Sequence, residues 1–546
     1  MMLKFHRQLS VLRTSNQAQS AIYLKDSRPT VVPGVCANHL LSLHMATTIW
    51  VAALMACVLV PVLLVDIPAM GDYLNHLARM YVLVMTKITE HPFYQVEGNL
   101  NPYQAMDLAV PLIARVMSVE AATKSFVIVS QLLMVTGAIA IEWAMKRRHQ
   151  LAGFAAVSVL YCMPFTWGLI NFQFGLAVAL WGIACWMFMP HEKWHIRFAC
   201  HSIFVVVIFL SHLFALGIYG VTIGMYELWR IRSRFLQAKQ VILSVLVLAT
   251  PPAILAAWIS FSGETIGGTT IEWSLFSKLI WPVRFMSGYS LPLSILSVMT
   301  VVCVWIILRA TNALRISVLG KWMVAGYLAL YLVMPYRLLD SAFIDIRVIC
   351  AGALILPAFI SFVPQRRWQF FLCGFAATLI VLGLTANVSA VWLSYRDEYA
   401  KMKLSFASIR YGSTILIGSS GEEHSNVQTE FPIYYAPTLA VYYAGALVSS
   451  FYTTPGVRNV TLKSEFRRFQ VGDDSFEYLP VSVRKLKAIA DGGQPFDVPD
   501  FARHWDNDFD YLYLVGRRIP NPMPQLLQEV FAGERFTLYR IRQRFS

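Results

Sequence analysis

Charged residues are scarce in this sequence. Only 14% of its 546 residues are Asp, Glu, Lys or Arg, and 57% are hydrophobic, whereas about a quarter of the residues in a soluble globular protein are charged. This composition excludes an ordinary soluble protein. The apolar runs extend from about Ala46 to Trp392, and the chain after Ser394 is polar and mixed. We therefore predict one polytopic membrane domain followed by one globular C-terminal domain.

Cysteine is also scarce, and its spacing is uninformative for metal binding. The sequence has eight cysteines and no CxxC pair, so it offers neither the spacing of a zinc site nor a disulfide framework. All of them except Cys36 lie in predicted membrane helices. We interpret them as small apolar packing residues.

Acidic residues are fewer than basic ones, 31 against 45, which gives a net charge of +14. In a soluble protein this excess would suggest nucleic acid as a partner. Here the basic residues lie mainly in short loops between apolar runs, where they set the orientation of the membrane helices. We therefore expect membrane lipid, and no nucleic acid, as a partner.

The apolar runs predict about eleven membrane-spanning helices. Many runs approach the roughly 20 residues that cross a bilayer. The stretch from Ala199 to Trp229 is too long for one span at about 1.5 Å per residue, so we divide it near His212 into two helices that go out and return. The remaining nine predicted spans are Ala46–Val65, Ala121–Ala144, Leu151–Trp167, Phe172–Met189, Val241–Ser260, Leu291–Leu308, Trp322–Pro335, Val348–Val363 and Phe370–Val391.

The basic loops predict the orientation of the chain. An odd number of spans places the N-terminus and the C-terminal domain on opposite sides. Cytoplasmic loops are enriched in Lys and Arg, so we predict a cytoplasmic, disordered tail over residues 1–44, a membrane domain over residues 45–393 and an extracytoplasmic domain over residues 394–546. Translation could also start at Met45. The basic loops are Lys146-Arg147-Arg148, Lys193 with Arg197, Arg230-Arg232-Arg234, Arg309 with Arg315, and Arg366-Arg367.

The C-terminal region has the pattern of a small α/β or α+β domain. Short β-like runs occur at Ser413–Gly418, Tyr511–Val515 and Phe536–Ile541, and Val481–Ala490 is helix-like. The region contains no GxGxxG, P-loop or GxSxG motif. The absence of cysteine there is compatible with an oxidising compartment such as the outer side of a bacterial plasma membrane.

Ionisable residues at a membrane edge are costly and therefore informative. The first such cluster is DIPAMGDYLNHLARMYVL, after the first span, with Asp66, Asp72, Asn75, His76 and Arg79. A helix starting at Asp72 would place the last four on one face, as an amphipathic helix on the membrane surface. Carboxylate and imidazole groups there could take a proton or hold a divalent metal. Alternatively, Asp72 caps the helix and the other residues form a solvated face.

A second cluster, YRLLDSAFIDIR, lies between the ninth and tenth predicted spans. Its residues are Arg337, Asp340, Asp345 and Arg347. Arginine pairs with phosphate oxygens through two hydrogen bonds, so the arginines could bind a phosphate. Equally, they could pair within the cluster, Arg337 with Asp340 and Asp345 with Arg347.

A third group consists of amide and imidazole side chains. Asn171 and Gln173 could recognise a sugar, or they could close a turn or bond one helix to another. His212 at the predicted helix division has the same two interpretations. Glu264 and Glu272, in an outer loop with several glycines, are weaker candidates for a further acidic group.

This organisation resembles the GT-C superfamily of polytopic membrane glycosyltransferases. One span is followed by an acidic outer loop, an amphipathic helix and the segment NPYQAMDLAVPLIARVMSVEAATKSFVIV, which leads into the second span. A divided helix near His212 and a soluble domain after the last span are similar too. The resemblance covers the architecture from Ala46 to Trp392. The sequence has no WWDYG block, which argues against an oligosaccharyltransferase.

The resemblance implies transfer of a sugar from a polyprenyl-phosphate donor to a glycan, lipid or protein acceptor in the cell envelope. The acidic residue of the first outer loop would correspond to Asp66 or Asp72, as catalytic base or as ligand of a divalent cation (Mg²⁺ or Mn²⁺), with His76 in support. Arg337 and Arg347 would bind the donor phosphate. The other expected substrate-binding residues are Arg79, Asn171, His212, Asp340 and Asp345.

Two other functions remain open from the sequence. A transporter or flippase for a lipid-linked substrate would use the same Arg and Asp residues, although the internal repeats typical of transporters are not visible. A non-catalytic component of polysaccharide assembly would use the outer domain for interaction. The aromatic stretch FPIYYAPTLAVYYAG, which begins at Phe431, could then be a docking face, but we favour it as core of the domain.

Overall fold

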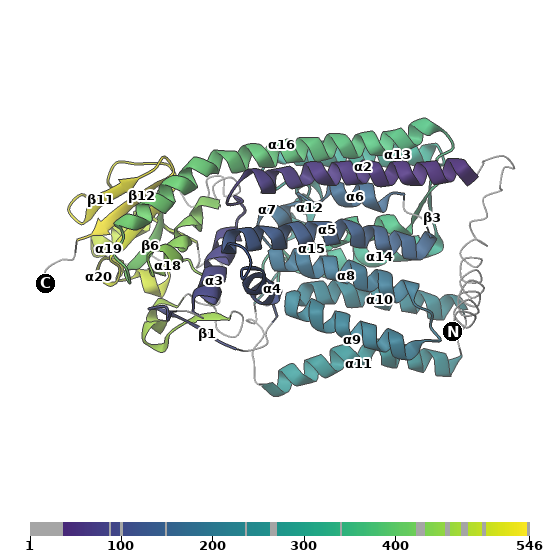
Figure 1. Ribbon diagram of the computed structural model, residues 1–546, viewed down its shortest axis with the longest axis horizontal. Helices are drawn as coiled ribbons and strands as arrows, with labels where there is room; N and C mark the ends of the chain where they lie inside the picture. The colour runs from purple at the N-terminus through teal and green to yellow at the C-terminus, as the bar shows by residue number, and fades with distance from the viewer. Residues whose placement is uncertain are drawn as a thin grey trace.

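The chain folds into a helix bundle with a sheet-containing domain at one end (Figure 1). The computed structural model describes residues 37–542 except 87–88, 99–101, 148–149, 235–236, 263–269, 339–340, 422–431, 454–458, 471–478 and 494–497, and it describes no side chains for residues 37–43, 234 and 262. We call the end of the bundle next to the C-terminal domain the near end, and the opposite end the far end. Residues 1–36 of the predicted tail lie outside the described part of the chain. The remaining tail residues already belong to the first helix, which begins at Ala37.

Seven of the described helices are long and apolar enough to cross a membrane, which makes this an integral membrane protein. They lie roughly side by side in the bundle (Figure 1) together with α10 (Leu213–Arg234) and the shorter α14 (Val318–Val333). The seven are α2 (Ala37–Leu64), α5 (Val119–Lys146), α8 (Ile170–Phe188), α9 (Trp194–Ser211), α11 (Ala238–Ser262), α13 (Leu291–Ala310) and α16 (Arg367–Ser405).

Two of the predicted spans are interrupted. The first consists of α6 (Ala152–Ser158), a turn and α7 (Met163–Thr166), in which Pro164 occupies the first turn. The second consists of α15 (Ile344–Ile355), a 3₁₀ turn containing Pro357 and strand β5 (Ile360–Phe362). Neither α6 nor α15 reaches the roughly 20 residues of a spanning helix. The count of eleven spans therefore stays a prediction.

The division of the long apolar stretch at His212 is confirmed. The helix α9 ends at Ser211, His212 has an extended backbone with φ −168° and ψ 124°, and α10 begins at Leu213. The break lies at the near end of the bundle (Figure 1). It therefore brings the His212 side chain to the end of the bundle that meets the C-terminal domain.

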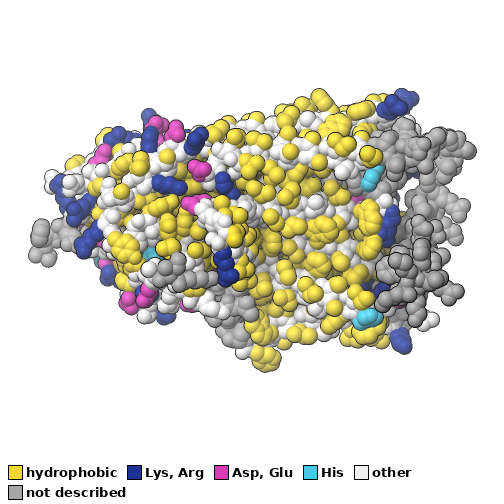
Figure 2. All heavy atoms as spheres, in the orientation of Figure 1, with side chains coloured by type: hydrophobic (Ala, Val, Ile, Leu, Met, Phe, Trp, Pro, Cys, Tyr) yellow, Lys and Arg dark blue, Asp and Glu magenta, His cyan; other side chains and the backbone are white. Residues whose placement is uncertain are grey.

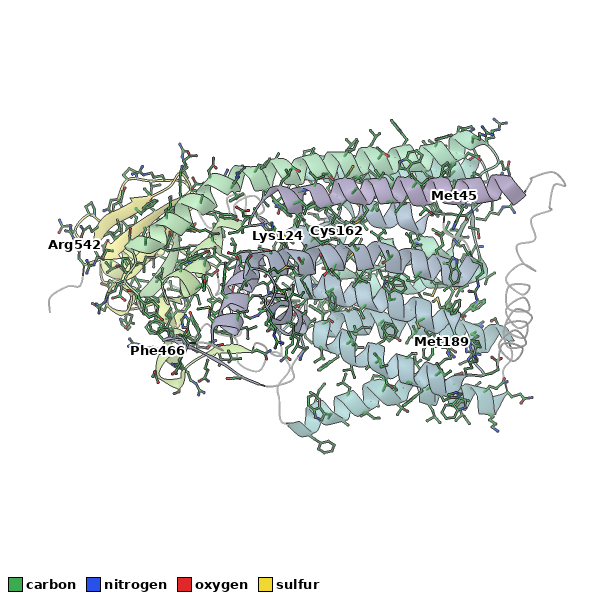
Figure 3. All side chains as sticks on the ribbon, viewed as in Figure 1. Met45, Lys124, Cys162, Met189, Phe466 and Arg542 are labelled. Atoms are coloured by element: carbon green, nitrogen blue, oxygen red, sulfur yellow. The ribbon has the colours of Figure 1, made fainter. Side chains whose placement is uncertain are left out.

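Short helices and strands connect the spanning helices. At the near end lie α3 (Tyr73–Met85), α4 (Ala105–Ile113) and α12 (Leu275–Arg284), together with β2 (Ile271–Glu272), which pairs with β4 (Arg337–Leu338). At the far end β3 (Leu314–Ile316) pairs antiparallel with β5. In Figure 3, Met45 and Met189 mark the far end and Lys124 the near end, where its Nζ donates to the carbonyl of Val65 at 2.9 Å.

The C-terminal domain is a mixed sheet with short helices. The helix α16 passes through the predicted boundary at residues 393 and 394 and continues into this domain. The sheet order is β11-β12-β10-β6-β7, with β9 also beside β6; β6 and β10 are parallel, and β12 is antiparallel to β10 and β11. The strands are β6 (Thr414–Ser419), β7 (Leu447–Val448), β9 (Val481–Ser482), β10 (Tyr511–Val515), β11 (Leu527–Ala532) and β12 (Phe536–Ile541).

The three predicted strands and the predicted helix of this domain are all present, the helix as β9 followed by α19. Most of the aromatic stretch after Phe431 is buried, as predicted for core. The domain's short helical segments are Phe406–Ser408, Ala436–Leu439, α18 (Ala440–Tyr443), Ser464–Phe469, α19 (Val483–Ala490), Asp500–Ala502 and α20 (Trp505–Asp508).

The surface separates into an apolar band and two polar ends. Figure 2 shows hydrophobic side chains over the bundle, and Lys and Arg side chains at the far end and over the C-terminal domain. The ends of α5, α10 and α13 and the start of α16 all lie at the far end (Figure 1). The basic loops of the sequence are thus at one end, the geometry that the predicted orientation requires. The sidedness itself stays a prediction.

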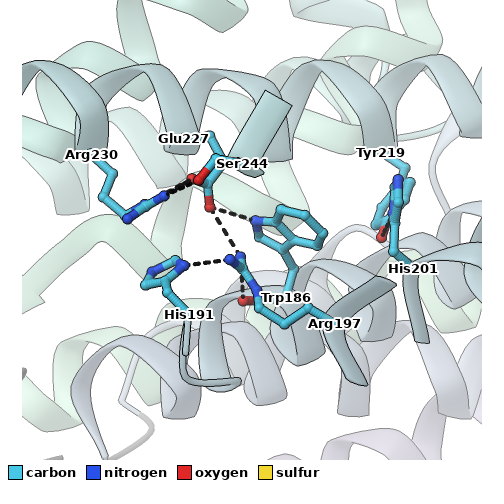
Figure 4. Close-up of polar contacts among 8 residues, drawn as sticks. All are labelled: Trp186, His191, Arg197, His201, Tyr219, Glu227, Arg230 and Ser244. Atoms are coloured by element: carbon cyan, nitrogen blue, oxygen red, sulfur yellow. Dashed lines mark hydrogen bonds and ion pairs between the residues drawn. The ribbon is translucent and has the colours of Figure 1, made fainter. Parts of the chain in front are cut away.

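A buried charged cluster joins α8, α9, α10 and α11 inside the far half of the bundle (Figure 4). The carboxylate of Glu227, which is 2% exposed, lies 3.0 Å from Arg197 and 2.7 Å from Arg230. It also accepts a hydrogen bond from the indole of Trp186 at 2.9 Å, and Arg230 donates to Ser244 at 2.7 Å. Buried charges need such partners to offset the cost of desolvation, so this cluster fixes the four helices to one another.

Candidate functional site

Asp72 is held at the near end by backbone contacts with the turn after α7. The N–H of Gly71 donates to the carbonyl of Thr166 at 3.0 Å, and the N–H of Asp72 donates to the carbonyl of Trp167 at 2.9 Å. Gly168 follows with φ +80°, and a Cβ there would lie 2.8 Å from the backbone nitrogen of Asp72. Only glycine adopts this conformation without cost, so Gly168 allows the two segments to touch.

The side chain of Asp72 contacts the C-terminal domain. Its Oδ1 accepts a hydrogen bond from the Tyr452 hydroxyl at 3.0 Å. Asp72 occupies the position before α3, yet its side chain makes no capping hydrogen bond to the helix. The interpretation of Asp72 as a simple helix cap is therefore wrong.

The helix α3 is present as predicted, but its predicted location on the membrane surface is wrong. Every residue from 73 to 83 is buried, and Asn75, His76 and Arg79 are 1%, 5% and 1% exposed. The C-terminal domain and α4 cover the helix, which a sequence pattern cannot reveal. Arg79 pairs with the buried Asp107 of α4, with its Nε and one terminal nitrogen 3.0 and 2.9 Å from Oδ1. The predicted phosphate-binding role of Arg79 thus competes with an internal ion pair.

Arg347, at the start of α15, is a buried cation. It is 4% exposed, and one terminal nitrogen lies 3.0 Å from Nε2 of His212 while the other donates to the carbonyl of Ala342 at 3.1 Å. Its guanidinium lies over the ring of Phe172 at 5.3 Å. Within the described part of the chain, no carboxylate lies within 4 Å of it, although it interacts electrostatically with Asp72. A buried guanidinium without an adjacent carboxylate is costly and suited to an anionic ligand.

His212 and Tyr103 complete one side of this region. Their rings meet edge to face with centroids 4.6 Å apart. Asn171 donates to the carbonyl of Tyr103 at 2.8 Å and accepts from the N–H of Met106 at 3.2 Å. Of the roles considered for Asn171, these contacts correspond to bonding one helix to another, because they join α8 to the start of α4.

The second predicted cluster is divided in the structure. Arg337 pairs with Glu272 at 3.0 Å, a partner from the outer loop. Asp345 is fully buried and faces Lys278 of α12 at 3.4 Å, so the considered pairing of Asp345 with Arg347 does not occur. Asp340 lies outside the described residues. Arg347 of this cluster interacts electrostatically with Asp72.

Three residues with contacts in this region were not predicted from the sequence, namely Tyr452, Tyr103 and Lys278. Tyr452 and Tyr103 lie in segments with no membrane-edge signal, and aromatic residues are abundant throughout the chain. Lys278 had a usable signal, because it is a cation in the interior of the amphipathic segment LFSKLIWPVR. Its Nζ donates to the carbonyl of Tyr331 at 2.7 Å and contacts the carbonyl of Met334.

An apolar cavity of about 560 Å³ opens beside this region. Its walls come mainly from α6, α13, α14, α15 and α16, and it extends from Met286 at the near end to Ile360 of β5 at the far end. Two of its wall residues, Val348 and Ile349, directly follow Arg347. Arg347 itself is not among the wall residues, and the cavity continues through the apolar part of the bundle.

The predicted cation ligands do not form a metal site among the residues that the structure describes. No three His, Cys, Asp or Glu side chains within them are grouped so that they could hold an ion. Asp66 is exposed, and the carboxylate of Asp72 already accepts a hydrogen bond from the Tyr452 hydroxyl. The residues present do not fit a resident Mg²⁺ or Mn²⁺, and this cofactor stays a prediction.

Comparison with known proteins found a similar solved structure but no match by sequence. No protein-family model matches the chain, and no curated protein matches it by sequence. The solved structure is ArnT from Cupriavidus metallidurans, a GT-C glycosyltransferase, in the apo state, with 12% identity and a TM-score of 0.48 over 90% of this chain and 98% of that chain. At this identity and TM-score, nothing about the site follows from the likeness.

The arrangement combines three chemical capacities. Asp72 supplies a carboxylate that is partly accessible, Arg347 supplies a buried cation within its electrostatic reach, and the apolar cavity is lined in part by Val348 and Ile349 of the same helix as Arg347. A carboxylate can accept a proton from a hydroxyl, and a guanidinium stabilises a developing negative charge on phosphate. The site is therefore suited to a substrate with an apolar chain and an anionic head.

Proposed function

We propose that this chain is a GT-C-type glycosyltransferase that transfers a sugar from a polyprenyl-phosphate donor to an envelope acceptor. The observation that supports this most directly is the electrostatic interaction between the Asp72 carboxylate and the buried Arg347 guanidinium at the near end of the bundle. Base and phosphate-binding cation are the two groups that this reaction requires. They come from separate clusters of the sequence, and the fold brings them together.

In the proposed reaction Asp72 is the general base. It takes the proton of an acceptor hydroxyl while the hydroxyl oxygen attacks the anomeric carbon of the donor sugar. The bond between that carbon and the phosphate oxygen breaks, and the carrier leaves as a phosphate monoester with one more negative charge. Arg347 stabilises this added charge. His212 is a neutral acceptor towards Arg347 in this arrangement, because an arginine side chain can only donate.

The cavity would hold the first part of the carrier chain. Its lining is almost entirely apolar, and burial of hydrocarbon there is favourable by about 25 cal/mol per Å². In this proposal the phosphate would lie outside the cavity at the near end, where Arg347 is. Asp66 is exposed and has no described contact with this region, so we assign the base role to Asp72 and give no step to a metal ion.

The orientation of the basic loops supports a site on the outer face of a bacterial plasma membrane. The far end, which holds these loops, would face the cytoplasm, and the near end with the C-terminal domain would face outwards. The acceptor would be a glycan, lipid or protein on that side. The identity of the sugar follows from none of the described contacts.

The test is transfer by the purified protein in lipid, with a panel of radiolabelled polyprenyl-phosphate sugars and extracted envelope acceptors. Asp72→Asn should lower the rate by at least about 100-fold, whereas the matched variant Asp66→Asn should retain most of it. Both variants need the thermal midpoint of the wild type for this comparison. Saturable carrier binding by the wild type without transfer from any donor would contradict the proposal and favour transport.

A further inference from the structure

The segment of residues 449–453, which follows β7 in the C-terminal domain, packs directly on α3. Asn75 of α3 anchors it through both ends of its amide: Nδ2 donates to the carbonyl of Ser450 at 2.8 Å, and Oδ1 accepts from the N–H of Tyr452 at 2.9 Å. Asn75 and Ser450 are 1% and 2% exposed. Two buried hydrogen bonds from one side chain fix both the position and the direction of this segment.

The anchored segment places the Tyr452 phenol against Asp72. The hydroxyl donates to Oδ1 at 3.0 Å, and the ring meets that of Tyr435 at a centroid distance of 5.4 Å. Burial, followed by the negative charge of Asp72, raises the pKa of Tyr452 well above its ordinary value. The phenol therefore keeps its proton and remains a donor over the whole pH range of an enzyme assay.

A pair of strands also attaches the C-terminal domain to the membrane domain near the segment of residues 449–453. Strand β1 (Tyr94–Val96), from the loop after α3, pairs antiparallel with β8 (Val460–Leu462). The hydroxyl of Tyr94 also accepts from the N–H of Val448, the last residue of β7. The segment that holds Tyr452 is thus attached to the membrane domain on both sides, which makes its contact with Asp72 a fixed part of the fold.

We propose that Tyr452 is a positioning residue of the active site, through which the C-terminal domain orients Asp72 and keeps it ionised. This inference rests on the proposed function. A hydrogen bond to a carboxylate favours its charged form, and a base must be charged to accept a proton. Arg347 of α15 interacts electrostatically with Asp72, and its charge acts in the same direction. Two further titratable groups are His76, one turn along α3, and Tyr435, whose ring contacts that of Tyr452. The C-terminal domain is therefore a component of the site and not only an attached module.

The test compares Tyr452→Phe with Tyr513→Phe. The control also removes one buried hydroxyl in the same domain, which contacts Ser405 far from Asp72. We expect Tyr452→Phe to lower kcat by about 10- to 100-fold, because a hydrogen bond to a charged group contributes about 1.5–3 kcal/mol. The acidic limb of its pH–rate profile should move to higher pH, and Tyr513→Phe should change neither. An equal loss in both variants, or an unmoved limb in Tyr452→Phe, would overturn the inference.

A measurement that does not depend on sugar transfer distinguishes the role of Tyr452 from the proposed glycosyltransferase function. Infrared difference spectra of the purified protein, with Asp72→Asn to identify the carboxylate band, follow ionisation of Asp72 in the absence of substrate. In Tyr452→Phe this ionisation should shift to higher pH than in the wild type. The same midpoint in both would refute the role of Tyr452 even if the wild type transfers sugar. If the midpoint shifts in Tyr452→Phe although the wild type transfers no sugar, the result would support the role of Tyr452 and contradict only the proposed function.

Discussion

The guanidinium of Arg347 lies 3.0 Å from Nε2 of His212, although the two residues are 135 positions apart in the sequence. His212 occupies the break between α9 and α10, and Arg347 lies in the first turn of α15. Each residue was a separate candidate in the sequence, at the near end of a different helix. Their contact explains why a helix break and a buried cation are found at the same level of the bundle.

Replacement of Arg347 should affect donor use far more than replacement of Arg337. Arg347 is buried and interacts electrostatically with Asp72, whereas Arg337 is already paired with Glu272, which is 46% exposed. We expect Arg347→Ala to reduce kcat/KM for the donor by roughly 100- to 1,000-fold, and Arg337→Ala by less than about 10-fold. Steady-state transfer with the donor concentration varied measures both. Similar losses in the two variants would contradict a phosphate-binding role specific to Arg347.

Gly168→Ala should disrupt the site through the backbone of Asp72. The residue has φ +80°, and the added Cβ would lie 2.8 Å from the nitrogen of Asp72 and 3.0 Å from that of Tyr73. Strain and this contact should together cost at least about 2 kcal/mol of stability or displace Asp72.

Gly217→Ala on α10 is the matched control, because no atom lies within 4 Å of its added Cβ. Gly168→Ala should therefore have both a lower thermal midpoint and a lower transfer rate than Gly217→Ala. A Gly168→Ala protein with both values unchanged would show that the contact between the two segments is not needed.

Much of the fold could be predicted because its signals are local. Apolar runs identified the long helices, the excess length between Ala199 and Trp229 identified the break at His212, and β-like runs identified β6, β10 and β12. The interruptions within α6–α7 and α15–β5 were missed. A buried, apolar stretch that contains proline has the same composition whether it forms one continuous helix or a helix interrupted by a turn.

The site could be predicted only in part because its contacts are long-range. Asp72, Arg347 and His212 stood out as polar groups at membrane edges. Tyr452 did not, since it lies 380 residues from Asp72 in a domain without such edges. The burial of α3 was missed for the same reason: the polar residues of its face are satisfied by partners from α4 and the C-terminal domain, which composition alone does not place there.

Acid should weaken the attachment of the C-terminal domain through His91. Its Nε2 lies 2.9 Å from the carbonyl of Val441 in that domain, and its Nδ1 accepts from the N–H groups of Phe93 and Tyr94 at 3.2 and 3.4 Å. Burial lowers the pKa of His91 below its ordinary value near 6.5. Below pH 6.5 the unfolded state therefore binds a proton more readily than the folded state. The stability that neutral His91 contributes is complete above pH 6.5 and is lost as the pH falls through its lowered pKa.

Thermal midpoints between pH 7.5 and 5 measure this effect. The wild type should lose more stability on acidification than His91→Gln, whose amide can donate and accept at similar positions without titrating. His195→Gln, at an exposed histidine of the far end, should keep the pH dependence of the wild type. Parallel curves for the wild type and His91→Gln would exclude this contribution.

Glu227→Gln should strongly destabilise the bundle without acting on the chemistry at its near end. The carboxylate lies between Arg197 and Arg230, both at most 4% exposed, and its removal would leave two buried guanidinium groups without a counter-charge. Loss of one partner from a buried ion pair costs about 3–5 kcal/mol.

The thermal midpoint of Glu227→Gln in detergent should therefore fall by several degrees, while the protein that remains folded transfers sugar at the wild-type rate. Glu272→Gln removes the exposed partner of Arg337 and is the control, because pairs that contact solvent contribute at most about 1 kcal/mol. A midpoint of Glu227→Gln equal to that of the control would mean that the four helices are held together by apolar packing alone. A reduced turnover of the folded fraction would instead indicate that the cluster is coupled to the site, since α8 and α10 extend from it to Asn171 and His212 at the near end.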